Sequence, residues 1–479
     1  MRALLATSIG VTCATALTLP LAAPAPAAPA LSPVAQAPAA APAEPAGSTQ
    51  SLPLRPLADA TPRATGRPTE SMTPPAARGL LRRDAHRFSL VGVVWDDADA
   101  ELHGTVQVRT RATGTAKWSG WQSLETHNTD HAADPGTPER DSGRVRGSTA
   151  PLWVGDSDGV EVRVRSENAG PRSGAPDTSP LPAGLQVELV DPGEDPVEPR
   201  AEGTPAPGTS SAVTAGTSSA GSATPATAVL PESAGLTMAA AESSAVNADL
   251  APLGATEITA LSKAESEEQA VVGAGAKPFV GPRPGIVTRK GWGADESLRE
   301  RAFAYTSTVK AAFVHHSATG NNYTCAQAPS VLRSIYRYHV KSSGWRDFGY
   351  NFAVDKCGKI YEGRAGGVTK PVLGAHTLGF NSNSMGIAVL GTYSSKNPPA
   401  AAVTAIAKLT AWKLGLFGRN PKGKVTLVSG GSGKYKKGAK ARLNVISGHR
   451  DGFATECPGI RLYKKLGTAR TSSAKLQGR

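Results

Sequence analysis

Aromatic residues are scarce in this chain of 479 residues: they make up 5% of it, and none lies between Trp153 and Phe279. The sequence also lacks a collagen period, a heptad run and a repeat of about 33–45 residues, which excludes fibrous and solenoid folds. Glycine (52) and proline (38) together make up about 19% of the chain, above their usual combined share of about 12%. This composition predicts two or three globular domains joined by poorly ordered segments.

Long apolar runs are absent beyond the N-terminus, so we expect no membrane span in the rest of the chain. The N-terminus itself begins Met1-Arg2, continues with an apolar run to Leu21, and then offers small residues at 23–30. This pattern predicts a secretory signal peptide over residues 1–30, with an N-terminal anchor helix as the alternative. We therefore expect a secreted, extracellular protein.

Two stretches have the composition of disordered chain. Residues 31–78 are rich in alanine and proline, and residues 195–276 are a low-complexity linker of alanine, serine, threonine and glycine. Between them, in residues 79–194, apolar and polar residues alternate in short runs separated by turn residues, which predicts a small all-β sandwich-like domain. Its four tryptophans form either a ligand platform or part of the core; they are Trp95, Trp118, Trp121 and Trp153.

Residues 277–479 alternate between strand and helix patterns. Strands are expected at 310–316, 350–354, 359–362, 385–390 and 443–446, with helices at 328–340 and 400–414. We therefore predict an α/β domain in which a mixed β-sheet is flanked by helices.

Metal-ligand residue types gather in this domain. Five of the nine histidines lie in it, and Cys457 follows the last of them by eight residues; the histidines are His315, His316, His339, His376 and His449. Two imidazoles and a thiolate suit Zn²⁺ and leave one tetrahedral position for water. Adjacent strand residues point to opposite faces, so His315 and His316 cannot both face a metal. A ligand set spread over distant strands favours a catalytic site over a structural finger, although isolated histidines are more often packing or surface residues.

Five motifs in sequence order resemble the peptidoglycan recognition protein and type 2 N-acetylmuramoyl-L-alanine amidase family over about residues 283–470. They lie at residues 289–294, 313–318, 347–364, 374–387 and 447–459. Residues 79–194 resemble the N-terminal β-domain often found ahead of secreted actinobacterial amidases, a resemblance that implies no chemistry.

The resemblance implies a zinc-dependent hydrolase that cleaves the amide between N-acetylmuramic acid and L-alanine in peptidoglycan. By position in the motifs, the zinc ligands are His315, His449 and Cys457, the catalytic residues are Tyr350 and Thr455, and the substrate-binding residues are His339, His376, Asn381 and Arg364. The alternative is a noncatalytic peptidoglycan-binding protein on the same fold, but such receptors typically lack the cysteine ligand.

The cysteines can then be assigned by elimination. Cys13 is removed with the signal and Cys457 is committed to zinc, which leaves Cys325 and Cys357. In an exported protein we expect these two to form a disulfide, worth roughly 3–4 kcal/mol for a loop of this length.

Acidic residues are rare from Lys277 onward, where 33 basic residues face 8 acidic ones, a net charge of +25, while residues 1–276 carry 19 basic and 31 acidic, or −12. Eight of the basic residues lie in the glycine-containing stretch 419–442, which we expect to form a mobile loop. For a secreted protein, anionic wall polymers are a more plausible partner of this loop than nucleic acid, and a merely solvated loop is the remaining alternative. We expect a cell-wall-associated monomer with no nucleic-acid partner.

Overall fold

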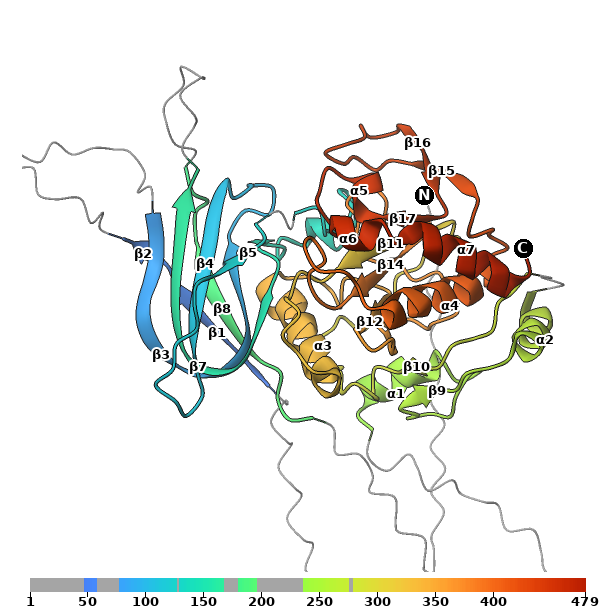
Figure 1. Cartoon of the computed structure of the whole chain (residues 1–479), viewed down its shortest axis with the longest axis horizontal. Helices are drawn as coiled ribbons and strands as arrows, with labels where there is room; N and C mark the ends of the chain where they lie inside the picture. Colours follow the sequence, from blue (N-terminus) through green and yellow to red (C-terminus); the bar gives the residue numbers. More distant parts are fainter. Residues whose placement is uncertain (1–46, 58–76, 127–128, 168–179, 196–235, 275–278) are drawn as a thin grey trace, which may run out of the picture. The chain divides into compact units, whose positions relative to one another are not determined.

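The computed structural model describes residues 47–57, 77–126, 129–167, 180–195, 236–274 and 279–479 (Figure 1). The predicted signal peptide and most of the alanine- and proline-rich segment therefore lie outside the described residues, as does the centre of the predicted linker, residues 196–235. Among the helices that the structure describes, none has the length and apolar character needed to cross a membrane.

The N-terminal part of the described chain is an antiparallel β domain, as predicted. Its strands are β1 (Ser48–Pro53), β2 (Arg55–Pro56), β3 (Ala77–Trp95), β4 (Gly104–Ala112), β5 (Gln122–Leu124), β6 (Gly147–Ser148), β7 (Leu152–Ser166) and β8 (Gln186–Asp191). The main sheet has the order β1-β8-β3-β7-β4-β5, and β2 and β6 pair with β3. A 3₁₀ turn, η1 (Arg140–Ser142), interrupts the long connection from β5 to β6.

Strand β1 corrects the prediction that residues 31–78 are disordered. It pairs with β8 along its whole length, from Ser48 opposite Asp191 to Pro53 opposite Gln186. Backbone hydrogen bonds to a neighbouring strand hold such an edge strand, and the composition of the segment gives no sign of them.

The tryptophans of the β domain divide into two pairs. Trp95 and Trp153 belong to buried cores, while Trp118 and Trp121 are partly exposed and stack with arginines. The guanidinium of Arg163 lies 4.0 Å from the ring centroid of Trp121.

The C-terminal part contains the predicted mixed sheet. Its strands are β9 (Glu257–Ile258), β10 (Ile286–Val287), β11 (Ala311–His316), β12 (Phe352–Val354), β13 (Ile360–Glu362), β14 (Ser384–Val389) and β17 (Ile446–Gly448). They lie in the order β17-β11-β14-β12-β13-β10-β9. Strand β11 runs parallel to both β14 and β17, and β12 runs parallel to β14 but antiparallel to β13.

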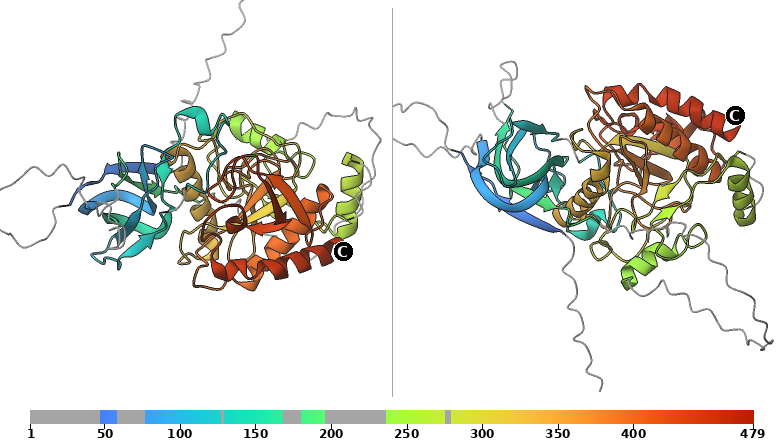
Figure 2. Two further views of the ribbon diagram at one scale, coloured as in Figure 1. Left: turned by 90° about the horizontal axis from the view of Figure 1, so that it is seen from above. Right: turned by 60° about the horizontal axis from the view of Figure 1, so that its bottom comes forward.

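Helices cover both faces of this sheet. In β14, Ile387 and Val389 pack in one core with α4 (Ala400–Leu416), whereas Ala388 packs in another with α3 (Ala328–Arg337). Successive strand residues point to opposite faces, so α3 and α4 lie on opposite sides. Helix α7 (Leu466–Gln477) lies alongside α4 (Figures 1 and 2). The short elements are η2 (Cys325–Gln327), the π-helical turn η3 (Tyr338–Ser342), α5 (His449–Gly452) and α6 (Ile460–Tyr463).

Helices α1 (Met238–Ala245) and α2 (Lys263–Ala274) correct the prediction of a linker over residues 195–276. The alanines that suggested low complexity are also good helix formers, and the Thr237 side chain caps α1 by accepting a hydrogen bond from the Ala240 N–H. Asn247, just after α1, donates a hydrogen bond of 2.9 Å to the buried Glu362 carboxylate. This segment is therefore part of the folded domain.

The basic stretch 419–442 is not the loop that we predicted but a hairpin, formed by β15 (Lys424–Val428) and β16 (Lys440–Asn444). Leu427 and Leu443 bury its apolar face against Phe380. At its tip, the Gly430 N–H donates to the Gly379 carbonyl over 2.7 Å. The alternation of apolar and basic residues thus directs the lysines to solvent.

The β domain and helix α3 share one apolar core. Leu90, Val94 and Val190 of the β domain belong to the same buried cluster as Val331 and the following turns of α3. The hydroxyl of Tyr338, in the same interface, donates to the Thr149 carbonyl over 3.0 Å.

A disulfide joins Cys325 and Cys357, as predicted. It links the start of η2, ahead of α3, to the turn between β12 and β13. Closing a loop of 32 residues in sequence separation limits the conformational freedom of the unfolded chain.

The buried carboxyl of Glu362 makes the stability of the fold depend on pH. Burial raises the pKa of this carboxyl from its ordinary 4.5 to about 7, although Asn247 and Arg289 favour the charged form and lower the pKa. The folded protein therefore holds this proton more tightly than the unfolded chain does, and stability falls as the pH rises from about 4.5 to about 7.

The variant Glu362→Gln carries no titrating group at this position. Between pH 5 and pH 8 we expect its unfolding free energy to rise relative to the wild type by roughly 2–3 kcal/mol, measured by urea denaturation at both pH values. A difference in unfolding free energy between the two proteins that stays the same at both pH values would contradict the raised pKa of Glu362.

Candidate metal centre

Two of the predicted ligands lie at neighbouring strand ends. His315 is the second-last residue of strand β11, and His449 directly follows β17, as the first residue of α5. Because β11 and β17 are parallel neighbours, with Val314 opposite Gly448, their carboxyl ends meet at one edge of the sheet. Cys457 lies in the loop after α5, where its N–H donates to the Thr455 hydroxyl over 3.2 Å.

The structure brings these three predicted ligands together. The Cys457 sulfur lies 3.7 Å from Nδ1 of His315, and the ligand atoms of the whole group lie within 4.8 Å of one another. Two ligands of one tetrahedral Zn²⁺, with bonds of about 2.3 Å to sulfur and 2.0 Å to nitrogen, are separated by roughly 3.6 Å. The observed spacing therefore fits zinc.

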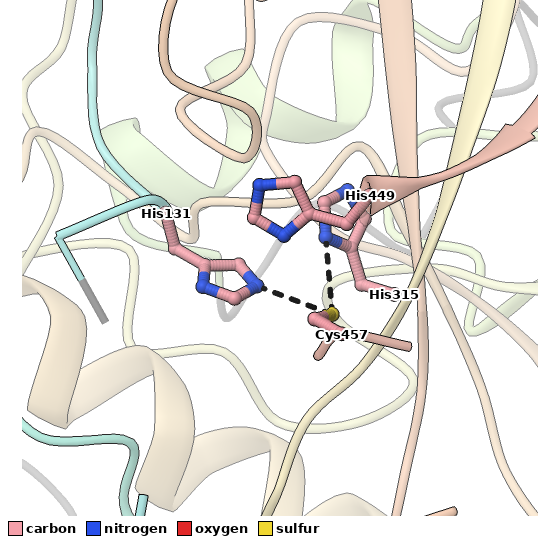
Figure 3. A group of neighbouring side chains, drawn as sticks. All are labelled: His131, His315, His449 and Cys457. Carbon is pink, nitrogen blue, oxygen red and sulfur yellow. Dashed lines mark hydrogen bonds between the residues drawn. The ribbon is translucent and has the colours of Figure 1, made fainter. Parts of the chain in front are cut away.

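A fourth residue, His131, completes the group, and the sequence analysis missed it. It comes from the connection between β5 and β6 of the β domain, and its Nε2 lies 3.6 Å from the Cys457 sulfur (Figure 3). The ring centroid of His131 lies 4.4 Å from that of His449 and 5.2 Å from that of His315. The four side chains are all buried.

Neighbouring polar groups orient two of the imidazoles. Asp130 places Oδ1 2.8 Å from Nδ1 of His131, so Nδ1 carries the proton and Nε2 offers its lone pair to the centre of the group. Thr377 places its hydroxyl 3.4 Å from Nε2 of His315, which leaves Nδ1 facing the sulfur. Metal-binding histidines generally have such a partner on the second ring nitrogen.

The ring nitrogens of His449 are better explained by a bound metal than by a hydrogen-bond network. Neither ring nitrogen of His449 has a hydrogen-bond partner of normal geometry among the described residues, although the side chain is fully buried. Burial, together with the neighbouring His449 and His131, keeps the pKa of His315 well below its ordinary value, so the ring is neutral. Burial likewise raises the pKa of the Cys457 thiol. A cation reverses this effect on the thiol, and neutral imidazoles are the form that binds metal.

The two predicted catalytic residues lie beside the group. The Tyr350 ring lies 5.2 Å, centroid to centroid, from that of His315, and burial, with the nearby Cys457, raises its pKa well above the ordinary value. The Thr455 hydroxyl accepts a hydrogen bond of 3.2 Å from the Cys457 N–H. Both side chains line a small pocket together with Cys457 and Glu125.

The four predicted substrate-binding residues are buried around the group. His376 lies 5.4 Å from the His315 ring, and His339 lies 5.9 Å from the Tyr350 ring. Arg364 and Asn381 are buried too, and both contact the β domain, in the connection between β5 and β6. Their role in binding substrate stays a prediction.

His316 is not among the four residues of the group, which agrees with the alternation of strand residues. Its Nδ1 accepts a hydrogen bond of 3.2 Å from the Tyr393 N–H.

Comparisons with known proteins agree with the motif analysis. Residues 305–460 match the family described as N-acetylmuramoyl-L-alanine amidase, and residues 34–183 match the family described as Rv3811 N-terminal galactose-binding domain-like. The chain is 31% identical to peptidoglycan-recognition protein SC2 of Drosophila simulans over 183 residues, which cover 38% of this chain and 85% of the relative. It is also 31% identical to the human N-acetylmuramoyl-L-alanine amidase over 190 residues, which cover 39% of this chain and 28% of the relative. Among solved structures, Drosophila PGRP-LB aligns with 25% identity over 38% of this chain and 92% of that protein, with a TM-score of 0.31.

A substitution at the sulfur tests the ligand set. We expect Cys457→Ser to weaken zinc binding at least about tenfold, because a hydroxyl is a much poorer zinc ligand than a thiolate. The circular dichroism spectrum should stay unchanged, since the strands that carry the histidines form without it.

The double variant Cys325→Ser/Cys357→Ser is the matched control, because it removes two sulfur atoms that lie outside the group. It should keep one zinc ion per chain. A zinc affinity of Cys457→Ser equal to that of the wild type, measured by competition with a chelator, would mean that the sulfur is not a ligand.

Proposed function

Because the chain belongs to the peptidoglycan recognition protein and N-acetylmuramoyl-L-alanine amidase family, we propose that it is a zinc-dependent amidase. Its substrate is the amide bond between N-acetylmuramic acid and L-alanine in peptidoglycan. The observation that carries the proposal is the buried cluster of His315, His449 and Cys457, whose spacing and chemistry fit one zinc ion.

Each residue of the centre has a role in this reaction. His315, His449 and Cys457 would hold the metal, which, when bound, would polarise the amide carbonyl and activate a water molecule for attack. Two neutral imidazoles and one thiolate leave the loaded site with a net charge of +1. A site of this charge stabilises the negative charge that develops on the amide oxygen.

Tyr350 and Thr455 are placed to act on the same oxygen. The raised pKa of Tyr350 keeps its hydroxyl protonated, so it donates a hydrogen bond to the developing oxyanion. The Thr455 hydroxyl, two residues before Cys457, is the second donor. Removal of one such donor typically costs about 3 kcal/mol of transition-state stabilisation.

Four buried residues form the binding site for the muropeptide in this proposal. Arg364 supplies a guanidinium fork that suits carboxylates of the stem peptide, and Asn381 supplies an amide donor. His339 and His376 border the reacting bond, and both are neutral because burial lowers their pKa values well below the ordinary value.

The alternative is a noncatalytic peptidoglycan-binding protein, and some relatives are named as recognition proteins. The complete set of His315, His449 and Cys457, with Tyr350 beside it, favours the enzyme. A binding protein does not need an activated water or a donor for an oxyanion.

We place the protein outside the cell, associated with the cell wall. The signal pattern at residues 1–30 and the Cys325–Cys357 disulfide support this location. The hairpin 419–442, whose lysines are exposed and whose stretch contains no acidic residue, is in this proposal a contact for anionic wall polymers.

Hydrolysis of purified peptidoglycan tests the proposed reaction. We expect new amino-terminal alanine, detected by end-group labelling, because cleavage of the amide frees that amine. A zinc chelator should abolish the release and added Zn²⁺ should restore it. The appearance of reducing sugar ends instead, or full activity in the presence of chelator, would contradict the proposal.

Charge reversal in the hairpin tests the wall contact. Lys436 and Lys437 are exposed, and their long-range attraction is screened within about 8 Å at physiological salt. We expect Lys436→Glu/Lys437→Glu to weaken sedimentation with intact walls severalfold at low salt and little at high salt. Turnover of a small soluble muropeptide should stay at the wild-type level.

The matched control is Lys396→Glu/Lys408→Glu, which reverses two exposed charges in α4 and the segment before it. Equal weakening by the two double variants would show that only net charge matters and that the hairpin has no particular role.

A further inference from the structure

The connection between β5 and β6 of the β domain lies against the metal group and against two of the residues assigned to substrate binding. We call residues 130–139 of this connection the blocking segment. It contacts the metal group, the catalytic side chain of Tyr350, and both Arg364 and Asn381.

His131 takes the ligand position that a catalytic zinc site keeps open. Such sites have three protein ligands and a fourth position for water or substrate, whereas sites with four protein ligands are structural. Here Nε2 of His131 lies as close to the Cys457 sulfur as Nδ1 of His315 does, at 3.6 Å against 3.7 Å. With Asp130 holding the opposite ring nitrogen, the imidazole is oriented as a ligand.

Glu139 forms an ion pair with the guanidinium of Arg364. Two parallel hydrogen bonds of 2.7 and 2.8 Å join the two side chains, and about 5–6% of each side chain is exposed. In a buried pair of this kind the carboxylate satisfies both guanidinium nitrogens, so a carboxylate of the substrate cannot bind there at the same time.

Ala132 and Asp134 likewise accept hydrogen bonds from the side chain of Asn381. The Asn381 amide nitrogen donates to the Ala132 carbonyl over 2.8 Å and to the Asp134 carboxylate over 2.7 Å. The same carboxylate accepts from the Gly379 N–H over 2.7 Å, and the Asp130 carbonyl accepts from the Leu378 N–H over 2.9 Å. Both the side chain of Asn381 and the backbone of residues 378–379 are thus bonded to the blocking segment.

His131 also lies beside a catalytic side chain, because its ring centroid is 5.9 Å from that of Tyr350. The segment therefore bonds to Arg364 and Asn381 while His131 enters the metal group next to Tyr350. These are the positions at which substrate and water would act.

We propose that the blocking segment is an intramolecular inhibitor, which keeps the enzyme latent by supplying His131 as the fourth zinc ligand and two carboxylates in place of the stem peptide. This inference rests on the proposed function, since it assumes that the same site binds muropeptide. In the closed form, substrate and water have no access to the metal.

The arrangement is a two-state equilibrium between a closed and an open segment. The apparent affinity for substrate falls in proportion to the open fraction, so a variant that opens the segment gains activity up to the inverse of that fraction. An open fraction of one tenth or less in the wild type corresponds to a gain of at least about tenfold.

Two variants and one control test the proposal. His131→Ala removes the fourth ligand, and Asp134→Ala removes the acceptor for Asn381 and Gly379 while all metal ligands remain. His103→Ala removes another histidine of the β domain, which is exposed and pairs with Glu101, and serves as the matched control.

The first readout is the electronic spectrum of the Co²⁺-loaded proteins, with acetohydroxamate as the probe of an open metal position. We expect no spectral change on adding the probe to the wild type or to His103→Ala, and a clear change for His131→Ala. The second readout is turnover of a soluble muropeptide by the zinc-loaded proteins. We expect at least a tenfold gain in kcat/KM for His131→Ala and a smaller gain for Asp134→Ala.

The outcomes separate this inference from the proposed function. A wild type that binds acetohydroxamate as readily as His131→Ala would overturn the blocking role. If His131→Ala failed to retain Co²⁺, Asp134→Ala would decide, and unchanged probe binding and turnover in that variant would also overturn the proposal. Open metal in both variants without any hydrolysis would confirm the block and refute the amidase function.

Discussion

The parallel pairing of β11 with β17 is the constraint on which the candidate site depends. Its register, with Ala312 opposite Ile446 and Val314 opposite Gly448, brings the carboxyl ends of two strands that are 130 residues apart in sequence to one edge of the sheet. His315 and His449 extend from that edge, and α5 turns the chain so that Cys457 returns to them. Buried apolar residues on both faces fix this register, because a slip of one residue would move each core side chain into the core on the opposite face.

The sequence predicted this half of the site and missed the other half for a physical reason. His315, His449 and Cys457 belong to motifs with a defined place on strands, and the mixed sheet followed from the alternation of strand and helix patterns. His131 lies in a long connection without periodicity, and it reaches the group only because the β domain packs on α3. The local signals were the spacing of four residues from His127 to His131 and the neighbouring Asp130, and both patterns are common without a metal. Composition likewise hid β1 and α1, whose stability depends on a neighbouring strand and on tertiary contacts.

The interface between the β domain and α3 therefore has a chemical consequence. Interfaces between domains of one chain are commonly polar and permit motion, but here Leu90, Val94 and Val190 pack in the same core as α3. A domain fixed in this way holds its β5–β6 connection beside the metal group and Arg364 at a high effective concentration. Weak individual contacts are therefore enough to keep the connection bound there. The buried pair of Glu139 and Arg364 adds specificity, since either charge left alone at that depth would be strongly destabilising.

Metal binding and closure of the segment are coupled if His131 is a zinc ligand. The free energy by which zinc favours the closed segment equals the free energy by which the closed segment tightens zinc binding. Zinc would then hold the enzyme closed as well as serve its chemistry, and the open enzyme would bind its metal less tightly than the closed one. In the proposed mechanism, a substrate that displaces Glu139 from Arg364 also removes His131 from the metal, because both residues belong to the blocking segment. Substrate carboxylates would then open the position that water needs, so that the reactive site forms only where its substrate is bound.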